Sequence, residues 1–399
     1  MGRSTVERAI LSLLVLTAFL IGVSTATATI PSNSTAQVRD AAVGKLSSSI
    51  PAGAVDVAPS DPVVISASGG TLGEVTATAA GGAPLAGQFN YDRTRWTSGP
   101  LAYSTAYTAS ATGRTADGDE IAPLQTTFST LKPNRTLAVE SIKPSNGEVV
   151  GVAMPVTINF SSAVTDKAAV QRRLAVITSV PTAGSFRWVS DDQVNWRPKE
   201  YWKAGTVVVV KAALAGVNTG NGVWGAKDTV NTFSIGRDQR AVGDVNTFHL
   251  TLYVDGKVVQ NLPASYGRPA YPTQYGVHVA YEKHPVKRMR SDTWAGGAQE
   301  GEPDFYDVEV PWAVRISENG EFSHGNASTV GQQGRRNVSH GCINLSPANG
   351  KLFYDWVQFG DPVEIVGSGR PLTPRDGLIA DWTIPWDEYI KGSALPDTI

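Results

Sequence analysis

An internal repeat with a period of about 100 residues constrains the fold of this chain more than any other feature of its sequence. Trp96 and Trp196 lie at matching places in the two copies, and each is soon followed by a proline and a tyrosine. The triplet Thr-Phe-Ser ends the first copy at residues 127–129 and the second at 232–234. Both copies consist of short runs rich in Val, Ile and Thr between turn residues. The repeat therefore predicts two similar β modules in tandem.

Each copy has the length and the turn spacing of an immunoglobulin-like β-sandwich. The first contains the hairpin signal Asp117-Gly118, and the second contains the alternating run at residues 155–160. The single cysteine, Cys342, lies outside both copies, so each core must rest on Trp, Phe and aliphatic packing without a disulfide. Neither copy gathers His, Asp or Cys residues. We therefore expect spacer domains at residues 51–133 and 134–237 and disfavour a ligand-binding role for them.

Charge and cysteine content exclude several functions. Lys and Arg number 34 against 36 Asp and Glu, and a net charge of −2 gives no general attraction to nucleic acid or to anionic membranes. One cysteine cannot form an internal disulfide or an all-thiolate metal site. The remaining interpretations of this cysteine are a buried side chain that only fills space, an intermolecular disulfide or a reactive thiol.

The N-terminus has the parts of an export signal. Two arginines flank the start, an apolar run of about 15 residues extends from Ala9 to Val23, and Ala26-Thr27-Ala28 offers a small-residue cleavage site. We expect residues 1–28 to be a secretory signal and residues 29–50 a polar linker. An uncleaved signal anchor that tethers the chain to a membrane is the alternative. Either reading places the rest of the chain outside the cytoplasmic membrane.

The chain changes character from about residue 238 onward, where all five histidines and the cysteine lie. Two hairpin signals, Asp255-Gly256 and Asn319-Gly320, follow alternating apolar runs. Ser346, followed by proline, predicts the start of a helix with one apolar face. We bound this module at residues 238–367, with a C-terminal extension at 368–399, and expect any chemistry to occur in it.

The surroundings of Cys342 favour catalysis over packing. It follows His340-Gly341, and His324 lies 18 positions before it. A nearby imidazole can take the proton of a thiol or stabilise the thiolate. Glycine permits backbone angles that turn amide N–H groups toward a substrate oxygen. A long polar loop between the two histidines suits a substrate-facing surface.

The arrangement of His324, a loop and then Ser-His-Gly-Cys-x-Asn at residues 339–344 resembles the signature of the YkuD-type L,D-transpeptidases, which are bacterial peptidoglycan cross-linking enzymes. The tail at residues 377–387 looks like the C-terminal extension of the mycobacterial-type members, which also carry tandem immunoglobulin-like domains. The resemblance implies a mainly β protein. Its two sandwiches would precede a catalytic β-sandwich module that has one helix, a lid loop and a C-terminal extension packed on it.

The resemblance also implies a reaction. Cys342 would attack the carbonyl of the third residue, a meso-diaminopimelate, in a donor tetrapeptide stem, and the terminal D-Ala would leave behind a thioester acyl-enzyme. An amine from an acceptor stem would then form a 3→3 cross-link. Carbapenem β-lactams are the inhibitors that this implies, and no cofactor is required.

The resemblance assigns roles to the residues around the cysteine. His324 is the candidate base, with the carbonyl of Gly325 as its partner, and His340 is expected to tune the thiolate or shape the site. Amides of Gly341 and Cys342 are the expected oxyanion donors. The remaining candidates for substrate contact are Asn344, Tyr306 and the lid residues Met289 and Trp294.

Two alternatives to a transpeptidase remain open. Water in place of the acceptor amine would give a cysteine hydrolase of stem peptides (an L,D-carboxypeptidase), and a decayed site would give a non-catalytic wall-binding protein. A metal site is disfavoured, because His249, His278 and His284 lack the spacing of convergent ligands. We expect His278 to be an ordinary strand residue.

Overall fold

The computed structural model describes residues 44–294, 296–374 and 380–396. The predicted export signal and residues 29–43 of the predicted linker lie outside these residues and stay predictions. The end of that linker was assigned wrongly, because Lys45–Ser48 form a strand of the first sandwich and Leu46 and Ile50 pack in its core. Within the described residues, no helix is both long enough and apolar enough to cross a membrane.

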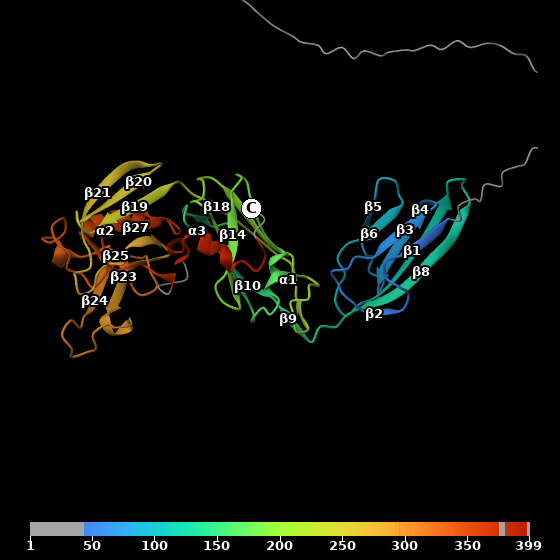
Figure 1. The fold of residues 1–399 in the computed structure, drawn as a ribbon, viewed down its shortest axis with the longest axis horizontal. Coiled ribbons are helices and arrows are strands. Elements are labelled where there is room, and N and C mark those ends of the chain that lie inside the picture. The colour runs from blue at the N-terminus through green and yellow to red at the C-terminus, as the bar shows by residue number, and fades with distance from the viewer. Residues whose placement is uncertain (1–43, 295, 375–379, 397–399) are drawn as a thin grey trace, which may run out of the picture. The chain divides into compact units, whose positions relative to one another are not determined.

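The first repeat folds into two four-stranded sheets that enclose one core (Figure 1). One sheet has the order β1 (Lys45–Ser48), β3 (Val64–Ser68), β6 (Arg95–Ser98) and β5 (Gly87–Phe89). The other has the order β2 (Ala54–Val57), β8 (Glu120–Thr130), β7 (Ala106–Thr115) and β4 (Gly70–Ala79). Along the long strands β7 and β8, buried residues alternate with more exposed ones, as a sandwich requires.

The second repeat also forms two four-stranded sheets. The first sheet has the order β10 (Val139–Lys143), β12 (Val156–Phe160), β15 (Gln193–Pro198) and β14 (Gly184–Trp188). The second has the order β11 (Val149–Val150), β18 (Thr229–Ile235), β16 (Val207–Ala212) and β13 (Leu174–Thr178). A short ribbon of β9 (Arg135–Leu137) with β17 (Val223–Gly225) and one helical turn, α1 (Lys167–Gln171), complete the module.

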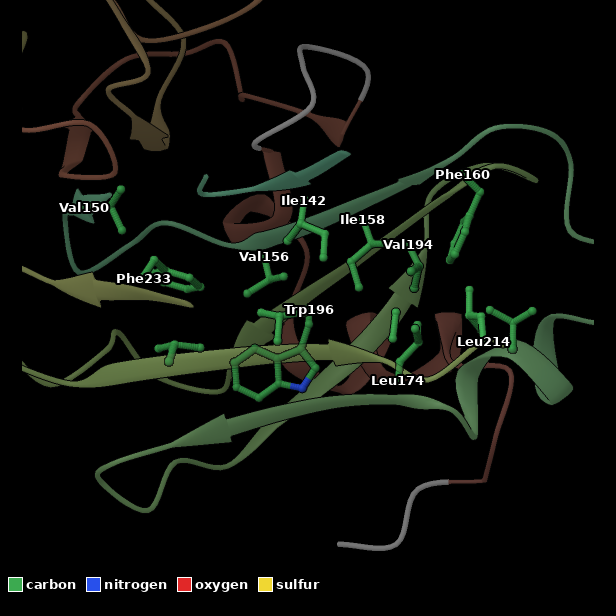
Figure 2. Close-up of a cluster of buried hydrophobic side chains, with 14 of the residues drawn as sticks. Ile142, Val150, Val156, Ile158, Phe160, Leu174, Val194, Trp196, Leu214 and Phe233 are labelled. Carbon is green, nitrogen blue, oxygen red and sulfur yellow. The ribbon is translucent and has the colours of Figure 1, made fainter. Parts of the chain in front are cut away.

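The two sandwiches have the same strand order, which confirms the repeat. Trp96 lies on β6 and Trp196 on the matching strand β15, and both rings are buried. On the neighbouring strand, an added Cβ on Gly87 or Gly184 would lie 2.1 or 2.0 Å from the ring of its tryptophan. Each ring therefore packs directly on a glycine, and aromatic and aliphatic contacts replace the missing disulfide. Figure 2 shows Trp196 among the aliphatic side chains of the second core.

The third module is one sheet of nine strands curled around a core. Its order is β22 (Gly276–Val279), β27 (Pro362–Val366), β19 (Gln239–Asp244), β20 (His249–Val254), β21 (Lys257–Ser265), β26 (Ile343–Leu345), β25 (Phe322–Gly325), β24 (Asp307–Arg315) and β23 (Glu282–Arg290). Most of β21 pairs with β20, but Ala264 and Ser265 pair with β26. The sheet turns there, so both halves face the same core. The expected catalytic sandwich is thus a single continuous sheet.

Local signals in this module fold as predicted. Asp255 and Gly256 both have positive φ (50° and 74°) in the hairpin between β20 and β21. Ser346 caps helix α2 (Pro347–Trp356) by accepting a hydrogen bond from the amide of Asn349 at 3.1 Å. An added Cβ on Gly350 of this helix would lie 2.8 Å from Gly325, so α2 lies directly against β25.

The C-terminal extension contacts both the catalytic module and the second sandwich. The amide of Tyr275 in the catalytic module donates to the carbonyl of Arg370 at 2.7 Å, and residues 380–383 lie against β22. In the second sandwich, the guanidinium of Arg197 lies over the rings of Trp382 and Tyr389, at 4.6 and 4.4 Å from the centroids. A buried cation attracts aromatic faces, so this segment joins the catalytic module to the second sandwich. The segment comprises η4 (Ala380–Thr383), α3 (Trp386–Tyr389) and η5 (Ile390–Gly392).

Candidate active site

Cys342 opens into a pocket of about 190 Å³ at the end of the curled sheet. Six of the residues proposed from the sequence line this pocket: Met289, Tyr306, His324, His340, Cys342 and Asn344. Trp294 lines a second pocket of about 490 Å³, and Met289 and Tyr306 belong to both. The candidates that lay up to 55 positions apart in the sequence are therefore brought to one place.

Parallel pairing of two short strands aligns the histidine and the cysteine. On β25 and β26, His324 is opposite Asn344. Cys342 comes just before β26 and packs with Phe322 of β25 in a small apolar cluster. Because alternate residues of a strand face the same side, Phe322 and His324 point the same way. His324 and Cys342 consequently face one cavity.

His324 is held as a neutral imidazole. Its Nδ1 lies 3.1 Å from the carbonyl oxygen of Gly325, the partner expected from the sequence. A carbonyl only accepts, so Nδ1 carries the proton and Nε2 carries the lone pair. Burial lowers the pKa of His324 more than this hydrogen bond raises it. The ring is thus in the form that can accept a proton at Nε2.

The thiol of Cys342 is also neutral at rest. Burial, with a smaller contribution from the negative charge of Glu321, raises its pKa to about 12. Its Sγ lies 3.9 Å from the carbonyl oxygen of Gly320. Among the described residues, no hydrogen bond joins Cys342 to His324. The two groups are a neutral pair, and transfer of the proton must accompany attack on a substrate.

The hydroxyl of Ser339 makes two hydrogen bonds in the turn before the cysteine. The amide of Gly341 donates to Oγ of Ser339 at 3.1 Å, and the same hydroxyl donates to the carbonyl of Cys342 at 2.6 Å. A serine side chain readily accepts from an amide two residues later. The Gly341 amide, which we expected to be an oxyanion donor, therefore has a side-chain acceptor in the site without substrate. Gly341 also has a φ of 125°, which glycine adopts readily.

Aromatic rings frame the pocket. His340 lies between Tyr271 and Tyr306, with ring centroids 5.1 and 5.0 Å away. Trp294 donates from Nε1 to the hydroxyl oxygen of Tyr306 at 3.1 Å, so that hydroxyl can donate its own hydrogen elsewhere. The rings of Tyr271 and Trp294 also lie nearly perpendicular to each other, with their centroids 5.9 Å apart. Sequence reasoning missed Tyr271, since no local motif marks it.

His340 is held by tilted ring contacts with Tyr271 and Tyr306. Burial lowers its pKa, and the positive charge of Arg268 lowers it further. Its Nε2 is buried and has no hydrogen-bond partner among the residues that the structure describes. Arg268 is itself paired with Asp304 at 2.7 Å. His340 therefore shapes the wall of the pocket as a neutral ring.

The other three histidines have protein partners. Nδ1 of His249 lies 2.7 Å from the carbonyl of Thr247, and Nε2 of His284 lies 2.5 Å from the carboxylate of Glu282. His278 lies on β22, as predicted, and its ring is buried. Within the described ranges, no group of three or more His, Cys, Asp or Glu side chains could hold a metal ion.

Comparison with known proteins agrees with this site. A family model described as the L,D-transpeptidase catalytic domain matches residues 238–365. A second model, described as a bacterial Ig domain, matches residues 54–218, which run through both sandwiches.

Relatives match almost the whole chain. L,D-transpeptidase 2 of Mycobacterium tuberculosis (strain CDC 1551 / Oshkosh) is 38% identical over 402 residues, which cover 98% of this chain and 97% of that protein. L,D-transpeptidase 5 of M. tuberculosis (strain ATCC 25618 / H37Rv) is 38% identical over 351 residues, which cover 86% of this chain and 75% of that protein. The solved structure of the LD transpeptidase LdtMt1 in complex with imipenem matches with a TM-score of 0.51 and 36% identity, covering 59% of this chain and 100% of that one. The chain belongs to the L,D-transpeptidase family, as a mycobacterial-type member with immunoglobulin-like domains before its catalytic domain.

Proposed function

We propose that this protein is a peptidoglycan L,D-transpeptidase that forms 3→3 cross-links through a thioester on Cys342. The observation that carries the proposal is the orientation of His324. Its Nδ1 is fixed on the carbonyl of Gly325, so the basic Nε2 is available in the pocket that holds the chain's single thiol.

In the first half-reaction, Nε2 of His324 removes the proton of Cys342 as Sγ attacks the carbonyl of meso-diaminopimelate in the donor stem. The charge that develops on the carbonyl oxygen needs donors. With the Gly341 amide occupied, the amide of Cys342 and the hydroxyl of Tyr306 are the best placed. The proton then passes from His324 to the nitrogen of D-Ala, and the peptide bond breaks to leave the thioester.

In the second half-reaction, the side-chain amine of an acceptor stem attacks the thioester carbonyl. His324 takes a proton from this amine, and the C–S bond breaks as the new amide forms. The sulfur leaves as the thiol after recovering the proton from His324. A neutral imidazole suits both steps, because it must accept and return one proton in each.

The two adjoining pockets favour transfer over hydrolysis. The pocket at Cys342 and the larger pocket at Trp294 meet along Met289 and Tyr306. A transferase must admit a second peptide while the first is still attached, whereas a hydrolase needs only water. We infer that donor and acceptor approach from these two sides.

The setting follows from the same proposal. We infer that residues 1–28 direct the chain out of the cytoplasm and that the sandwiches hold the catalytic module away from its point of attachment. Carbapenems are expected to acylate Cys342, since they offer a strained carbonyl to the same nucleophile.

Intact-mass measurement tests the nucleophile. Wild-type protein treated with a carbapenem is expected to gain one adduct, and Cys342→Ala is expected to gain none while keeping its circular dichroism spectrum. Full adduct formation on the variant would rule out Cys342.

Product analysis tests the reaction. A tetrapeptide donor with an acceptor stem is expected to give a cross-linked dimer, and the donor alone is expected to give little cleavage. If the donor were cleaved to a tripeptide to the same extent with and without the acceptor stem, the protein would be a hydrolase instead.

A further inference from the structure

A buried acid and a buried base lie beneath the nucleophile, and the mechanism above does not use them. His278 on β22 is 1% exposed, and Glu321, just before β25, is 6% exposed. Nδ1 of His278 lies 3.8 Å from Oε2 of Glu321. The two residues are 43 positions apart in the sequence, so only the fold brings them together.

The partners of His278 indicate that its ring is protonated. Nδ1 lies 3.2 Å from the carbonyl oxygen of Ile316, and Nε2 lies 2.9 Å from the carbonyl oxygen of Gln274. A neutral imidazole carries one proton and would point a lone pair at one of these oxygens. The imidazolium form donates at both nitrogens and also faces a carboxylate.

The partners of Glu321 favour the ionised carboxylate. The amide of Gln274 donates to Oε1 of Glu321 at 2.9 Å. Hydrogen bonds that donors make to a carboxylate stabilise its charged form. A charged carboxylate this deeply buried also requires a nearby cation, which His278 supplies.

Glu321 supports the backbone of the nucleophile turn. An added Cβ on Gly341 would lie 3.5 Å from Oε1 of Glu321, so the carboxylate packs against this glycine. The segment that binds Glu321 also binds the turn, because Thr273 donates its hydroxyl to the carbonyl of Gly341 at 2.7 Å. The charge of Glu321 is close enough to Cys342 to raise the pKa of the thiol.

We propose that His278 and Glu321 form a buried ion pair that positions the nucleophile, in which the carboxylate supports the Gly341–Cys342 turn and the imidazolium compensates its charge beneath the sulfur. Both are positioning residues, since they act on the sulfur through the turn and through their charge. The proposal rests on the proposed role of Cys342, and its test does not require transpeptidation.

Other charged groups near the sulfur are accounted for. His324 and His340 are neutral rings with lowered pKa values, and the pKa of Tyr306 is raised by burial. Arg315 at the end of β24 is paired with Glu282 at 3.2 Å. Substitution of one member of the His278–Glu321 pair is therefore the direct way to unbalance the charge under Cys342.

The test measures the rate of Cys342 alkylation by iodoacetamide against pH in the full chain. His278→Gln leaves a carboxylate without its cation and is expected to move the apparent thiol pKa up by about one pH unit. Glu321→Gln removes the anion and is expected to move it down by a similar amount. The double variant is expected to return close to the wild-type value, because neither charge remains.

This sign pattern separates an electrostatic role from a structural one. Loss of packing alone would shift the apparent thiol pKa of both single variants in the same direction, and the double variant would show the largest shift. That result, or the absence of any shift in Glu321→Gln, would overturn the proposal. If His278→Gln does not fold, Glu321→Gln and the double variant still decide the question, with circular dichroism as the check on folding. Alkylation needs no substrate, so a failure of transpeptidation would be seen separately.

Discussion

Asp361 is expected to make the protein less stable as the pH rises from 5 to 8. The residue lies between α2 and β27, where its side chain is completely buried. Oδ2 accepts the amide of Gln358 at 2.7 Å, but Oδ1 has no hydrogen-bond partner among the described residues. An added Cβ on Gly151 of the second sandwich would lie 2.2 Å from Oδ1, so backbone covers that oxygen.

Burial raises the pKa of Asp361 from 3.8 to about 7. Between these values the unfolded chain has lost the proton and the folded chain keeps it. The unfolded state therefore binds fewer protons, and the free energy of unfolding falls by about 1.4 kcal/mol for each pH unit. From pH 5 to pH 8 the loss is about 2–3 kcal/mol, because the fall levels off above pH 7.

Asp361→Asn removes this titration while keeping an acceptor for the Gln358 amide. The difference in unfolding free energy between variant and wild type is expected to shift by about 2–3 kcal/mol in favour of the variant from pH 5 to pH 8. Urea unfolding followed by tryptophan fluorescence at both pH values measures it. Asp255→Asn in the exposed hairpin is the matched control and is expected to show no such shift. A variant with the same pH dependence as the wild type would refute the reasoning.

Three further substitutions test the site and the repeat. Ser339→Ala removes the two hydrogen bonds that its hydroxyl makes in the nucleophile turn and is expected to slow acylation by a carbapenem about tenfold in stopped-flow absorbance, whereas an unchanged rate would show that the turn holds without them. Tyr306→Phe removes a proposed oxyanion donor and is expected to lower the cross-linking rate about 100-fold with binding of the donor stem retained, and an equal loss of binding would point to a packing role. Gly184→Ala places a Cβ 2.0 Å from the ring of Trp196 and is expected to cost about 1–3 kcal/mol in urea unfolding, while Gly331→Ala, which meets nothing within 4 Å, is expected to cost less than about 0.5 kcal/mol; equal costs would contradict the packing argument.

The features that were predicted correctly from the sequence depend mainly on residues that are neighbours in the chain. The hairpin at Asp255-Gly256 and the cap at Ser346 depend on a few adjacent positions, and both formed as predicted. The repeat was visible because two tryptophans occupy equivalent strands. The carbonyl partner of His324 was expected from the family resemblance, and it lies at Gly325 in the structure.

The features that were missed depend on contacts between distant segments. Glu321 was not among the sequence candidates, and only the fold, in which β25 pairs with β26, places it against Gly341. The side-chain acceptor of the Gly341 amide was also missed, because a serine two residues away can either cap a turn or face solvent. The contact of the tail with the second sandwich was also missed, since its aromatic residues fit any apolar face, and the buried guanidinium of Arg197 favours this one.

The hydrogen-bonded turn and the protonated thiol are related, because a neutral thiol reacts only when it is well placed beside its base. A thiolate reacts with oxidants far more readily than a thiol does, and the proposed setting outside the cytoplasm offers no reducing pool. A thiol with a pKa raised to about 12 is protected there, but it is a weak nucleophile until a base removes its proton. His324 must then be in place at the moment of attack, because the thiol loses its proton only during that step. The geometry of the turn that carries the thiol therefore matters for the reaction. This explains why Ser339, Thr273 and Glu321 all hold the two residues Gly341 and Cys342.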